Sequence, residues 1–463
     1  MIDRDAFEAL AAATFASLPG PDGQDGQQGE RISLYLAAEH SQFIRFNQAQ
    51  VRQATDVAQA LLSVSRTRGQ RMASATVTLS GVPADDVARV LAAAQGLADD
   101  LPHLPDDPHL MLPDTVAHTT QDSGLSDDAW PDPQAVVRDV AQAADGHDVV
   151  GLYAAGPVVR AYADNRGQRN WFRGASYALD WSHVLQADQA VKSLIAGPLA
   201  PQGWSLERER LQRRMQDASQ QLRLLQRPMR QLAPGRYRAW LSPAAMAELL
   251  GTLAWGAFGL KEQRTGTSPF NRLVQGERLH PAVHLSETIA PALAPAFTPQ
   301  GFVRPDHVPL VQAGVLSGSL VSPRSAREFS VAGQATWTPN SHGGESPEAL
   351  HLAAGTLADA DVLRELGTGL YIGNLHYLNY SDRLQCRVTG MTRYACFWVE
   401  DGQIVAPLPV MRFDQDVIRL LGDDLIALGD QAEWQPDLQT YGQRSVGGVR
   451  TPGALVAGLT LTL

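Results

Sequence analysis

Residues 31–81, RISLYLAAEHSQFIRFNQAQVRQATDVAQALLSVSRTRGQRMASATVTLSG, decide the fold of this chain. Four runs within it have the residue pattern of β-strands, and turn residues lie between them. The runs are 31–39, 42–53, 60–67 and 71–81. Because the runs follow one another at short and regular intervals, the stretch predicts an antiparallel meander of four strands.

Helices are predicted on both sides of this meander. Phe7, Leu10, Ala11 and Leu18 mark an amphipathic helix near the start of the chain. Two more helices are predicted later, over 83–101, where Pro83 precedes an acidic first turn, and over 132–146.

Strands resume in HDVVGLYAAGPVVRAYADNRGQRNWFRGASYALDW, residues 147–181. The tetrad from Asp164 to Gly167 predicts a hairpin turn, because Asn and Gly tolerate positive φ. We therefore assign residues 1–195 to an N-terminal α+β domain.

The remainder of the chain reads as a connecting helix followed by strands. Residues 196–235 contain a long helix with seven arginines between Arg208 and Arg230. From 236 to 463 strand patterns dominate, with hairpins predicted at Ala313-Gly314 and Asp401-Gly402. The expected fold class is α+β, with an N-terminal antiparallel sheet covered by helices and a C-terminal β-rich domain.

Charge and composition narrow the classes of function. The chain has 463 residues, a formal net charge of −11 and only two cysteines. The acidic balance opposes a general attraction to nucleic acid or anionic lipid. The N-terminus lacks the basic region of a signal peptide, and no apolar run is long enough to span a bilayer. We expect a cytoplasmic protein with no membrane partner and no nucleic-acid partner.

The sequence lacks HExxH, GxSxG, P-loop and GxGxxG motifs. Its nearest metal-like spacing is His280 and His284, with Glu287 three residues later. Pro281 and the pattern around it favour an extended segment, so ordinary surface histidines are the favoured interpretation and a zinc site is the alternative. The arginine-rich helix likewise offers two interpretations, a nucleic-acid contact or the solvated face of a connector.

The densest polar and aromatic stretch is 374–403, NLHYLNYSDRLQCRVTGMTRYACFWVEDGQ. His376, Tyr377, Tyr380, Arg383 and Arg393 are the candidate residues for binding a peptide or lining a chamber. Aromatic and arginine side chains on a sheet suit recognition of an extended peptide. A packed strand whose other face meets water or another subunit explains the pattern equally well.

Residues 242–259, SPAAMAELLGTLAWGAFG, predict a helix made for burial. Ser242 can cap its first turn and Pro243 suits its first position. Met246, Leu249, Leu250, Leu253 and Ala257 then recur at helical spacing, and Glu248 is the one ionisable side chain.

Three short stretches give the chain a resemblance to the TldD/PmbA family. They are SQFIRFNQAQVRQ, GLYAAGPVVRAYADNRG, and ELGTGLYIGN followed by FWVEDGQIVAPL. In this family a zinc-bearing TldD-type subunit pairs with a PmbA/TldE-type subunit of the same fold. The zinc subunit carries HExxxH on a helix, and a cysteine near its C-terminus completes the metal site.

The helix at 242–259 resembles that zinc helix in position but lacks its ligands. Aligned to the motif, this sequence reads Glu248-Leu249-Leu250-Gly251-Thr252-Leu253, so Glu248 stands at the first histidine position and Leu253 at the second. The C-terminal stretch TYGQRSVGGVRTPGA has no cysteine. The resemblance therefore implies a PmbA/TldE-type subunit with no catalytic residue, metal ligand or cofactor of its own.

The resemblance also implies the partners. They are a TldD-like subunit that holds the zinc and an unfolded peptide that binds as an added strand; a homodimer of the isolated chain is also plausible. Two alternatives are a self-sufficient peptide hydrolase with an unrecognised metal site and a regulator that binds DNA or gyrase.

Overall fold

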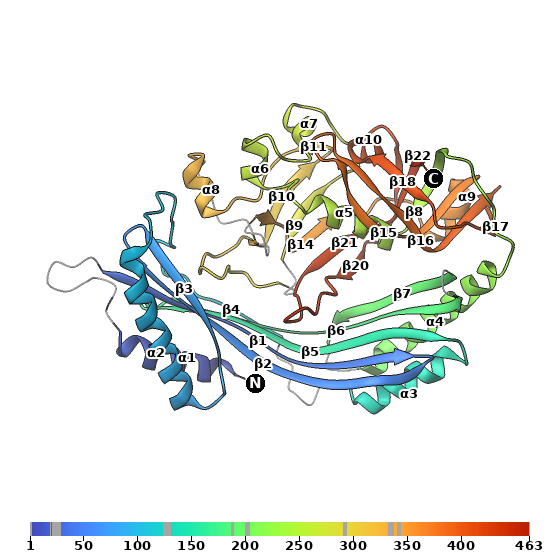
Figure 1. Cartoon of the computed structure of the whole chain (residues 1–463). Helices are drawn as coiled ribbons and strands as arrows, with labels where there is room; N and C mark the ends of the chain where they lie inside the picture. Colours follow the sequence, from blue (N-terminus) through green and yellow to red (C-terminus); the bar gives the residue numbers. More distant parts are fainter. Residues whose placement is uncertain are drawn as a thin grey trace.

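The computed structural model describes residues 2–18, 20, 29–123, 131–186, 189–199, 204–289, 294–331, 338–339 and 344–462. Figure 1 shows its two parts, a long curved sheet from the first part of the chain and a strand-rich region packed over one face of that sheet. The fold is α+β, as the sequence predicts.

Within the described residues, the N-terminal sheet contains seven strands. Its order is β3-β2-β1-β5-β6-β4, and β7 also pairs with β6. All pairings are antiparallel except that between β4 and β6. The strands are β1 (Glu30–Asn47), β2 (Gln50–Arg68), β3 (Arg71–Thr78), β4 (Thr119–Asp122), β5 (Val149–Asp164), β6 (Arg169–Gln186) and β7 (Gln189–Pro198).

The opening meander has three strands in the continuously described range 29–123, so the expectation of four was wrong. The first run and most of the second belong to a single strand, β1, which continues through His40 and Ser41, and the last residues of the second run already belong to β2. The chain reverses later, at Gln48 and Ala49, where φ is +53° and +55°. Two positive φ values match the twist of a two-residue hairpin, but neither residue is one that usually signals such a turn.

Four helices cover this sheet or flank it (Figure 1). They are α1 (Arg4–Ala16), α2 (Pro83–Asp100), α3 (Pro133–Ala144) and α4 (Trp204–Leu225). One core cluster joins α1 and α2 to β1, β2 and β5, and another joins α3 and α4 to β5, β6 and β7. The predicted helices at 83–101 and 132–146 are thus present within two residues of their expected ends.

The C-terminal region contains two larger sheets. In the first, β15 (Gly369–Asp382), β8 (Gly235–Leu241), β22 (Ala454–Leu461), β18 (Arg412–Asp416) and β16 (Arg387–Glu400) follow one another, and β15 pairs again with β16 to close the ring. β17 (Gln403–Pro407) and β19 (Leu425–Leu428) extend it. The hairpins at Ala313-Gly314 and Asp401-Gly402 form where the sequence predicts them.

The second C-terminal sheet has the order β11-β10-β9-β14-β21-β20. Its strands are β9 (Leu285–Thr288), β10 (His307–Gln312), β11 (Val315–Leu316), β14 (Ala349–Leu352), β20 (Glu433–Pro436) and β21 (Gly448–Thr451). A short pair, β12 (Thr338–Pro339) and β13 (Glu345–Ser346), stands apart. The helices here are α5 (Pro243–Leu253), α6 (Leu260–Arg264), α7 (Asn271–Val274), α8 (Pro323–Glu328), α9 (Val362–Leu366) and α10 (Val417–Leu421).

Arg444, near the end of the chain, joins the C-terminal region to the N-terminal sheet through hydrogen bonds. Arg444 is 7% exposed, and its guanidinium donates to the Gly156 carbonyl at 2.9 Å and to Ser176 Oγ at 2.8 Å. Its backbone N–H donates to the Glu39 carboxylate at 3.2 Å. Burial lowers the pKa of Arg444 to about 10, so the side chain is still charged at neutral pH.

Among the described residues, no helix combines the length and the apolar character that crossing a membrane requires. Both cysteines, Cys386 and Cys396, are buried and free.

Candidate functional site

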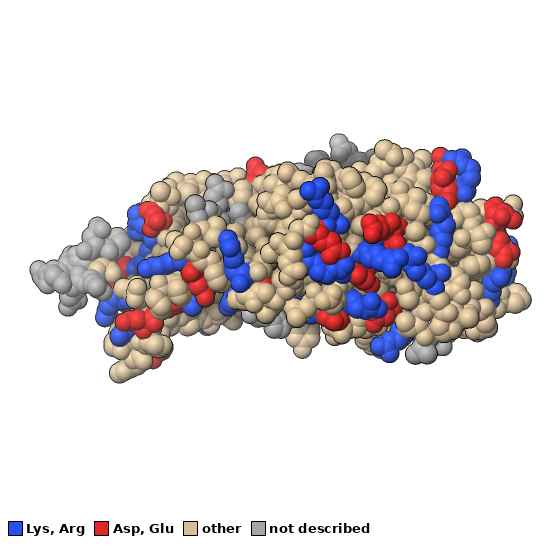
Figure 2. Space-filling model, turned by 90° about the horizontal axis from the view of Figure 1, so that it is seen from above, with Lys and Arg blue, Asp and Glu red and all other residues tan. Residues whose placement is uncertain are grey.

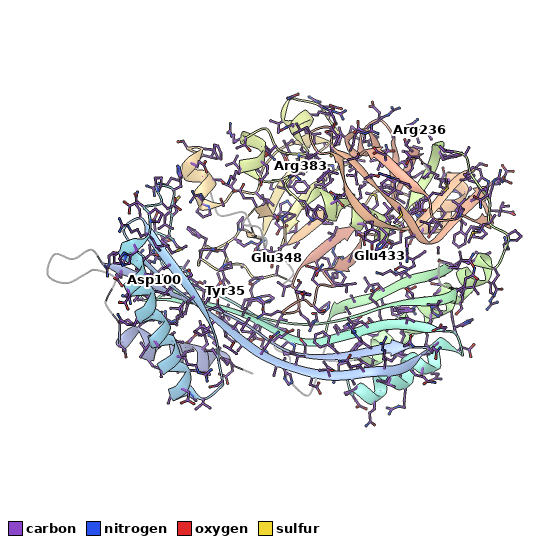
Figure 3. All side chains as sticks on the ribbon, viewed as in Figure 1. Tyr35, Asp100, Arg236, Glu348, Arg383 and Glu433 are labelled. Carbon is purple, nitrogen blue, oxygen red and sulfur yellow. The ribbon has the colours of Figure 1, made fainter. Side chains whose placement is uncertain are left out.

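A cavity of about 1650 Å³ lies where the C-terminal region faces the N-terminal sheet. One wall comes from β6, β7 and α4, and the other from α5, β15, β16 and the segment around β20. Figure 3 places Glu348 and Glu433 on the side of the C-terminal region that faces the sheet, with Arg383 higher in that region. The cavity is therefore built from segments far apart in the sequence.

Helix α5 reaches this cavity with one of its faces. Ser242 caps the helix by accepting from the Ala245 N–H at 3.2 Å, and its hydroxyl donates to the Gly373 carbonyl of β15 at 2.7 Å. The core face, formed by Met246, Leu249, Leu250 and Leu253, is at most 2% exposed. The cavity face carries Ala244, Ala247, Glu248, Gly251 and Thr252. The helix is thus a packing element, as predicted, that also presents one carboxylate to the cavity.

The cavity lining is predominantly acidic. Among the described residues it carries seven carboxylate side chains and three basic ones, a formal excess of four negative charges. The acidic residues are Asp180, Asp217, Glu248, Glu348, Asp359, Glu433 and Asp437; the basic ones are Arg160, Lys192 and Arg214.

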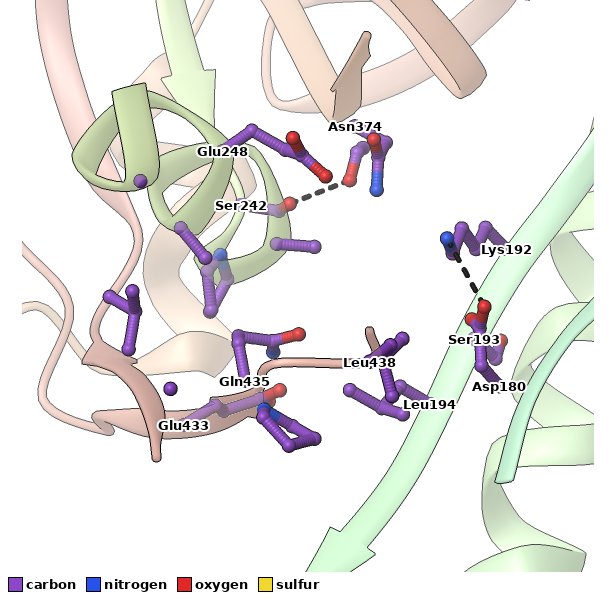
Figure 4. A pocket seen from close by; sticks show the side chains of 18 of the residues that line it. Asp180, Lys192, Ser193, Leu194, Ser242, Glu248, Asn374, Glu433, Gln435 and Leu438 are labelled. Atoms are coloured by element: carbon purple, nitrogen blue, oxygen red, sulfur yellow. Dashed lines mark hydrogen bonds and ion pairs between the residues drawn. The ribbon is translucent and has the colours of Figure 1, made fainter. Parts of the chain in front are cut away.

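Two ion pairs connect lining residues with each other. Lys192 Nζ on β7 lies 3.3 Å from Asp180 Oδ2 on β6, and Arg214 on α4 lies 2.7 Å from Glu433 on β20. Figure 4 shows Glu248 on the opposite wall from the Lys192–Asp180 pair. Within the described part of the chain, the Glu248 carboxylate makes no hydrogen bond or ion pair.

The walls perturb the ionisation of two of these carboxyls. The pKa of Glu248 is raised chiefly because the surrounding walls exclude bulk water; Lys192 lowers it and Asp180 raises it further. Burial likewise raises the pKa of Asp180, which Lys192 partly offsets. Both shifts reflect the same physical cause, a carboxylate held in a restricted and already negative space.

Two of the five residues singled out in the sequence support the backbone beyond the end of α5. Tyr380 donates from its hydroxyl to the Thr252 carbonyl at 2.9 Å. Arg383 donates to the carbonyls of Trp255 at 2.6 Å and Thr267 at 3.0 Å, and its guanidinium lies 5.2 Å from the Tyr380 ring centre. Their contacts are those of a scaffold.

The other three residues are also not among the residues that line the cavity. The rings of His376 and Tyr377 are tilted by 49° to each other with their centres 4.2 Å apart, and Tyr377 is 75% exposed. Arg393 lies over the Tyr394 ring at 5.4 Å. From this hairpin the lining takes neighbouring residues instead, including Asn374, Leu378 and Tyr394. A peptide contact at the five residues stays a prediction.

The alternative metal site is not assembled in the structure. His280 and His284 flank a turn instead of lying on one strand, and their Nδ1 atoms accept from the N–H groups of Ala282 and Ala313. Glu287 is buried and paired with Arg304 at 2.7 Å; burial raises its pKa to about 7. In the described parts of the chain, no three histidine, cysteine or carboxylate side chains come together in a group able to hold a metal ion.

The arginines of α4 and its C-terminal extension bind neighbouring elements. Arg208 pairs with Asp139 of α3, Arg214 with Glu433, and Arg230 with Glu400. Arg210 donates to the Ala196 carbonyl and Arg227 to that of Ile404. These contacts favour the connector interpretation of the helix.

Figure 2 shows Lys and Arg interleaved with Asp and Glu on the face seen from above, which belongs mostly to the C-terminal region.

Sequence reasoning missed Asp180, Lys192 and Glu433 as site residues. Asp180 and Lys192 lie in ordinary strand patterns, and only the pairing of β6 with β7 brings them together. The sequence offered one signal for these residues, a single charged residue at a strand position that faces inward. Charged residues are seldom buried without a partner, so such a position indicates an ion pair or a site.

A family model described as the PmbA/TldA metallopeptidase C-terminal domain matches residues 234–463. The C-terminal region of the chain therefore carries a domain of the PmbA/TldD family. A search of curated proteins returned no match.

Solved structures of similar fold extend the likeness over the whole chain. TldE from Thermococcus kodakarensis has a TM-score of 0.75 at 13% identity and covers 99% of this chain and 100% of its own. A candidate modulator of DNA gyrase from Thermotoga maritima MSB8 has a TM-score of 0.73 at 14% identity, covering 99% of both chains. Another, from Bacteroides thetaiotaomicron VPI-5482, has 0.72 at 15%, covering 100% of both. At these identities the likeness establishes a shared fold, and it includes the N-terminal sheet.

Proposed function

We propose that this PmbA/TldD-family chain is a non-catalytic, TldE-like subunit that joins a zinc-bearing TldD-like partner and helps to enclose unfolded peptides for cleavage. The observation that carries the proposal is the cavity face of α5. Where the family places metal ligands, this face presents Ala247, Glu248, Gly251 and Thr252. One carboxylate and one hydroxyl do not make the histidine-rich donor set that zinc prefers.

The burial of α5 favours another register for the comparison of this helix with HExxxH. Leu249 and Leu253 point into the core, at 2% and 0% exposure, so a motif running from Glu248 to Leu253 would bury its second histidine. Ala247 and Thr252 are a pair with the same spacing, and both line the cavity. In that register Glu248 occupies the glutamate position of the motif, and both histidine positions carry residues that cannot bind zinc.

Because this chain lacks the zinc-binding donor set, the proposal assigns different roles to the partner and to this chain. Zinc held by the partner would supply Lewis-acid activation of water and of the scissile carbonyl. This chain would supply a wall of the chamber, with a sheet along one side and α5 along the other. Its own residues take part by binding and enclosing the peptide, and no step of bond cleavage is assigned to them.

The proposal is tested by filling the cavity. A Cβ atom on Gly251 would meet nothing within 4 Å, and Gly251 lines the cavity, so Gly251→Trp should extend an indole into the space. Gly96 on α2 is equally unobstructed and lies outside the cavity, so Gly96→Trp is the matched control. Each variant is co-expressed with a TldD-like partner, and assembly is followed by native mass spectrometry alongside peptide cleavage.

We expect both variants to assemble, and only Gly251→Trp to lose cleavage by the complex. Stoichiometric zinc in the isolated chain, with chelator-sensitive peptide cleavage, would show the chain to be a hydrolase in its own right. Failure of the unmodified chain to assemble with any TldD-like partner would remove the proposed subunit role.

A further inference from the structure

One edge of the N-terminal sheet lines the cavity, and β16 and β20 approach the strand β7 that forms it. β7 is the last strand on its side of the N-terminal sheet and pairs only with β6 in the described residues. The backbone N–H of Leu199 donates to the Ala175 carbonyl of β6, so the polar backbone groups of Leu199 point toward β6. The Ala196 carbonyl accepts from Arg210, which lies outside the sheet, so the groups of Ala196 point away from β6. Because the bonding direction alternates along a strand, the N–H and C=O groups of Lys192 and Leu194 also point away from β6.

These outward groups have no hydrogen-bond partner within the described part of the chain, and both residues line the cavity. An unpaired N–H and C=O pair at every second residue is the feature to which an extended peptide adds as a strand. β20, on the other wall, is a poorer template. The N–H of Asp437 donates to the Gly447 carbonyl on the side of β21, so the backbone of the preceding residue, Pro436, points to the opposite side. Proline has no N–H, so a peptide strand would find no donor there.

The charge around this edge favours one sign of side chain. The lining has an excess of four negative charges, and the basic residues Lys192 and Arg214 are already engaged with Asp180 and Glu433. Glu248 remains unpaired within the described residues and faces the cavity from the wall opposite β7 (Figure 4). Both Lys192 and Asp180 act electrostatically on its carboxyl, so β7 and Glu248 belong to the same small region.

We propose that the cavity binds an extended peptide along β7 at residues 192–194 and selects for a lysine or arginine side chain, which Glu248 receives. The inference rests on the proposed function and adds the chemical class of the peptide. A carboxylate with free lone pairs accepts charge-assisted hydrogen bonds from an ammonium or guanidinium group. An acidic side chain in the same place would meet the negative lining and be repelled.

The test uses three fluorescent, unstructured peptides of equal length that differ only at the central residue, which is lysine, norleucine or glutamate. Binding to the full chain is measured by fluorescence anisotropy at low and high salt. We expect the affinity to fall from lysine to norleucine to glutamate, with about a tenfold difference between the first two at low salt. Added salt should compress the series because it screens charge.

Two variants assign the effect to the proposed residues. Glu248→Gln should bring the lysine peptide to the affinity of the norleucine peptide and leave the latter unchanged. Glu328→Gln, an exposed carboxylate on α8 outside the cavity, is the matched control and should change nothing. Leu194→Pro removes one outward N–H at an edge position that tolerates proline, so it should weaken all three peptides alike.

The outcomes separate this inference from the proposed function. Equal binding of the lysine and glutamate peptides, or a loss in Glu248→Gln that is the same for lysine and norleucine, overturns the charge preference and leaves peptide binding intact. Binding of no peptide to the chain overturns the inference, whereas the proposed subunit role is overturned by failure to assemble with a TldD-like partner.

Discussion

In helix α5 and in the β15–β16 hairpin, the residue composition and the position relative to the cavity disagree in opposite directions. The helix reads as a chemically empty packing element, yet it presents Glu248 to the cavity between the C-terminal region and the N-terminal sheet. The hairpin is crowded with aromatic and basic residues, yet Tyr380 and Arg383 are committed to backbone carbonyls. A dense group of polar residues can therefore be scaffold, while the proposed site includes one charge on an apolar helix that is unpaired among the described residues.

The largest expected effect separates the two faces of α5. Leu253→His places an imidazole in the core and should destabilise the fold by about 2–5 kcal/mol, because a buried Leu is lost and a polar group gains no partner. Ala247→His, one turn and a half earlier, extends into the cavity and should stay near the parent stability. Urea unfolding at pH 7.5 compares them; equal stability of both variants would contradict the assigned register.

A smaller effect is expected at the hairpin. Arg383→Ala removes two hydrogen bonds to backbone carbonyls, so it should lower stability by about 1–3 kcal/mol and leave peptide affinity unchanged. Arg393→Ala is the comparison variant; it loses the contact with the ring of Tyr394, worth about 0.5–1 kcal/mol. Thermal unfolding and peptide binding are measured on both. Weaker binding without loss of stability would restore the hairpin as a recognition surface.

The smallest effect concerns pH. Because the folded state raises the pKa of Glu248, it holds a proton that the unfolded chain has already released. Stability from this group is therefore lost as pH rises from the unfolded value through the raised folded one. Glu248→Gln removes that loss, so its advantage in urea midpoint over the parent should grow between pH 4 and 7. An advantage that shrinks over this range would mean that the carboxylate is stabilised in the fold.

The sequence predicts the fold better than the site because the two depend on interactions of different range. Alternation in β1 and β2 and the proline-initiated helix at Pro83 are local patterns, and the structure confirms them. The turn at Gln48-Ala49 was not predicted, because its positive φ values belong to residue types that seldom adopt them. The cavity combines Asp180, Glu248 and Glu433, which no local pattern can bring together.

The position of Arg444 sets the order in which this molecule can be completed during synthesis. Its backbone N–H bonds to a carboxylate 405 residues earlier in the chain, and its side chain satisfies carbonyls on β5 and β6. At roughly 5–20 residues per second, a ribosome finishes β7 well before it reaches Arg444. Until then, the groups of Glu39, Gly156 and Ser176 that bond to Arg444 in the finished fold remain in contact with water. A nascent chain stalled before this arginine would carry all of its N-terminal strands and still lack the fastening that closes the chamber.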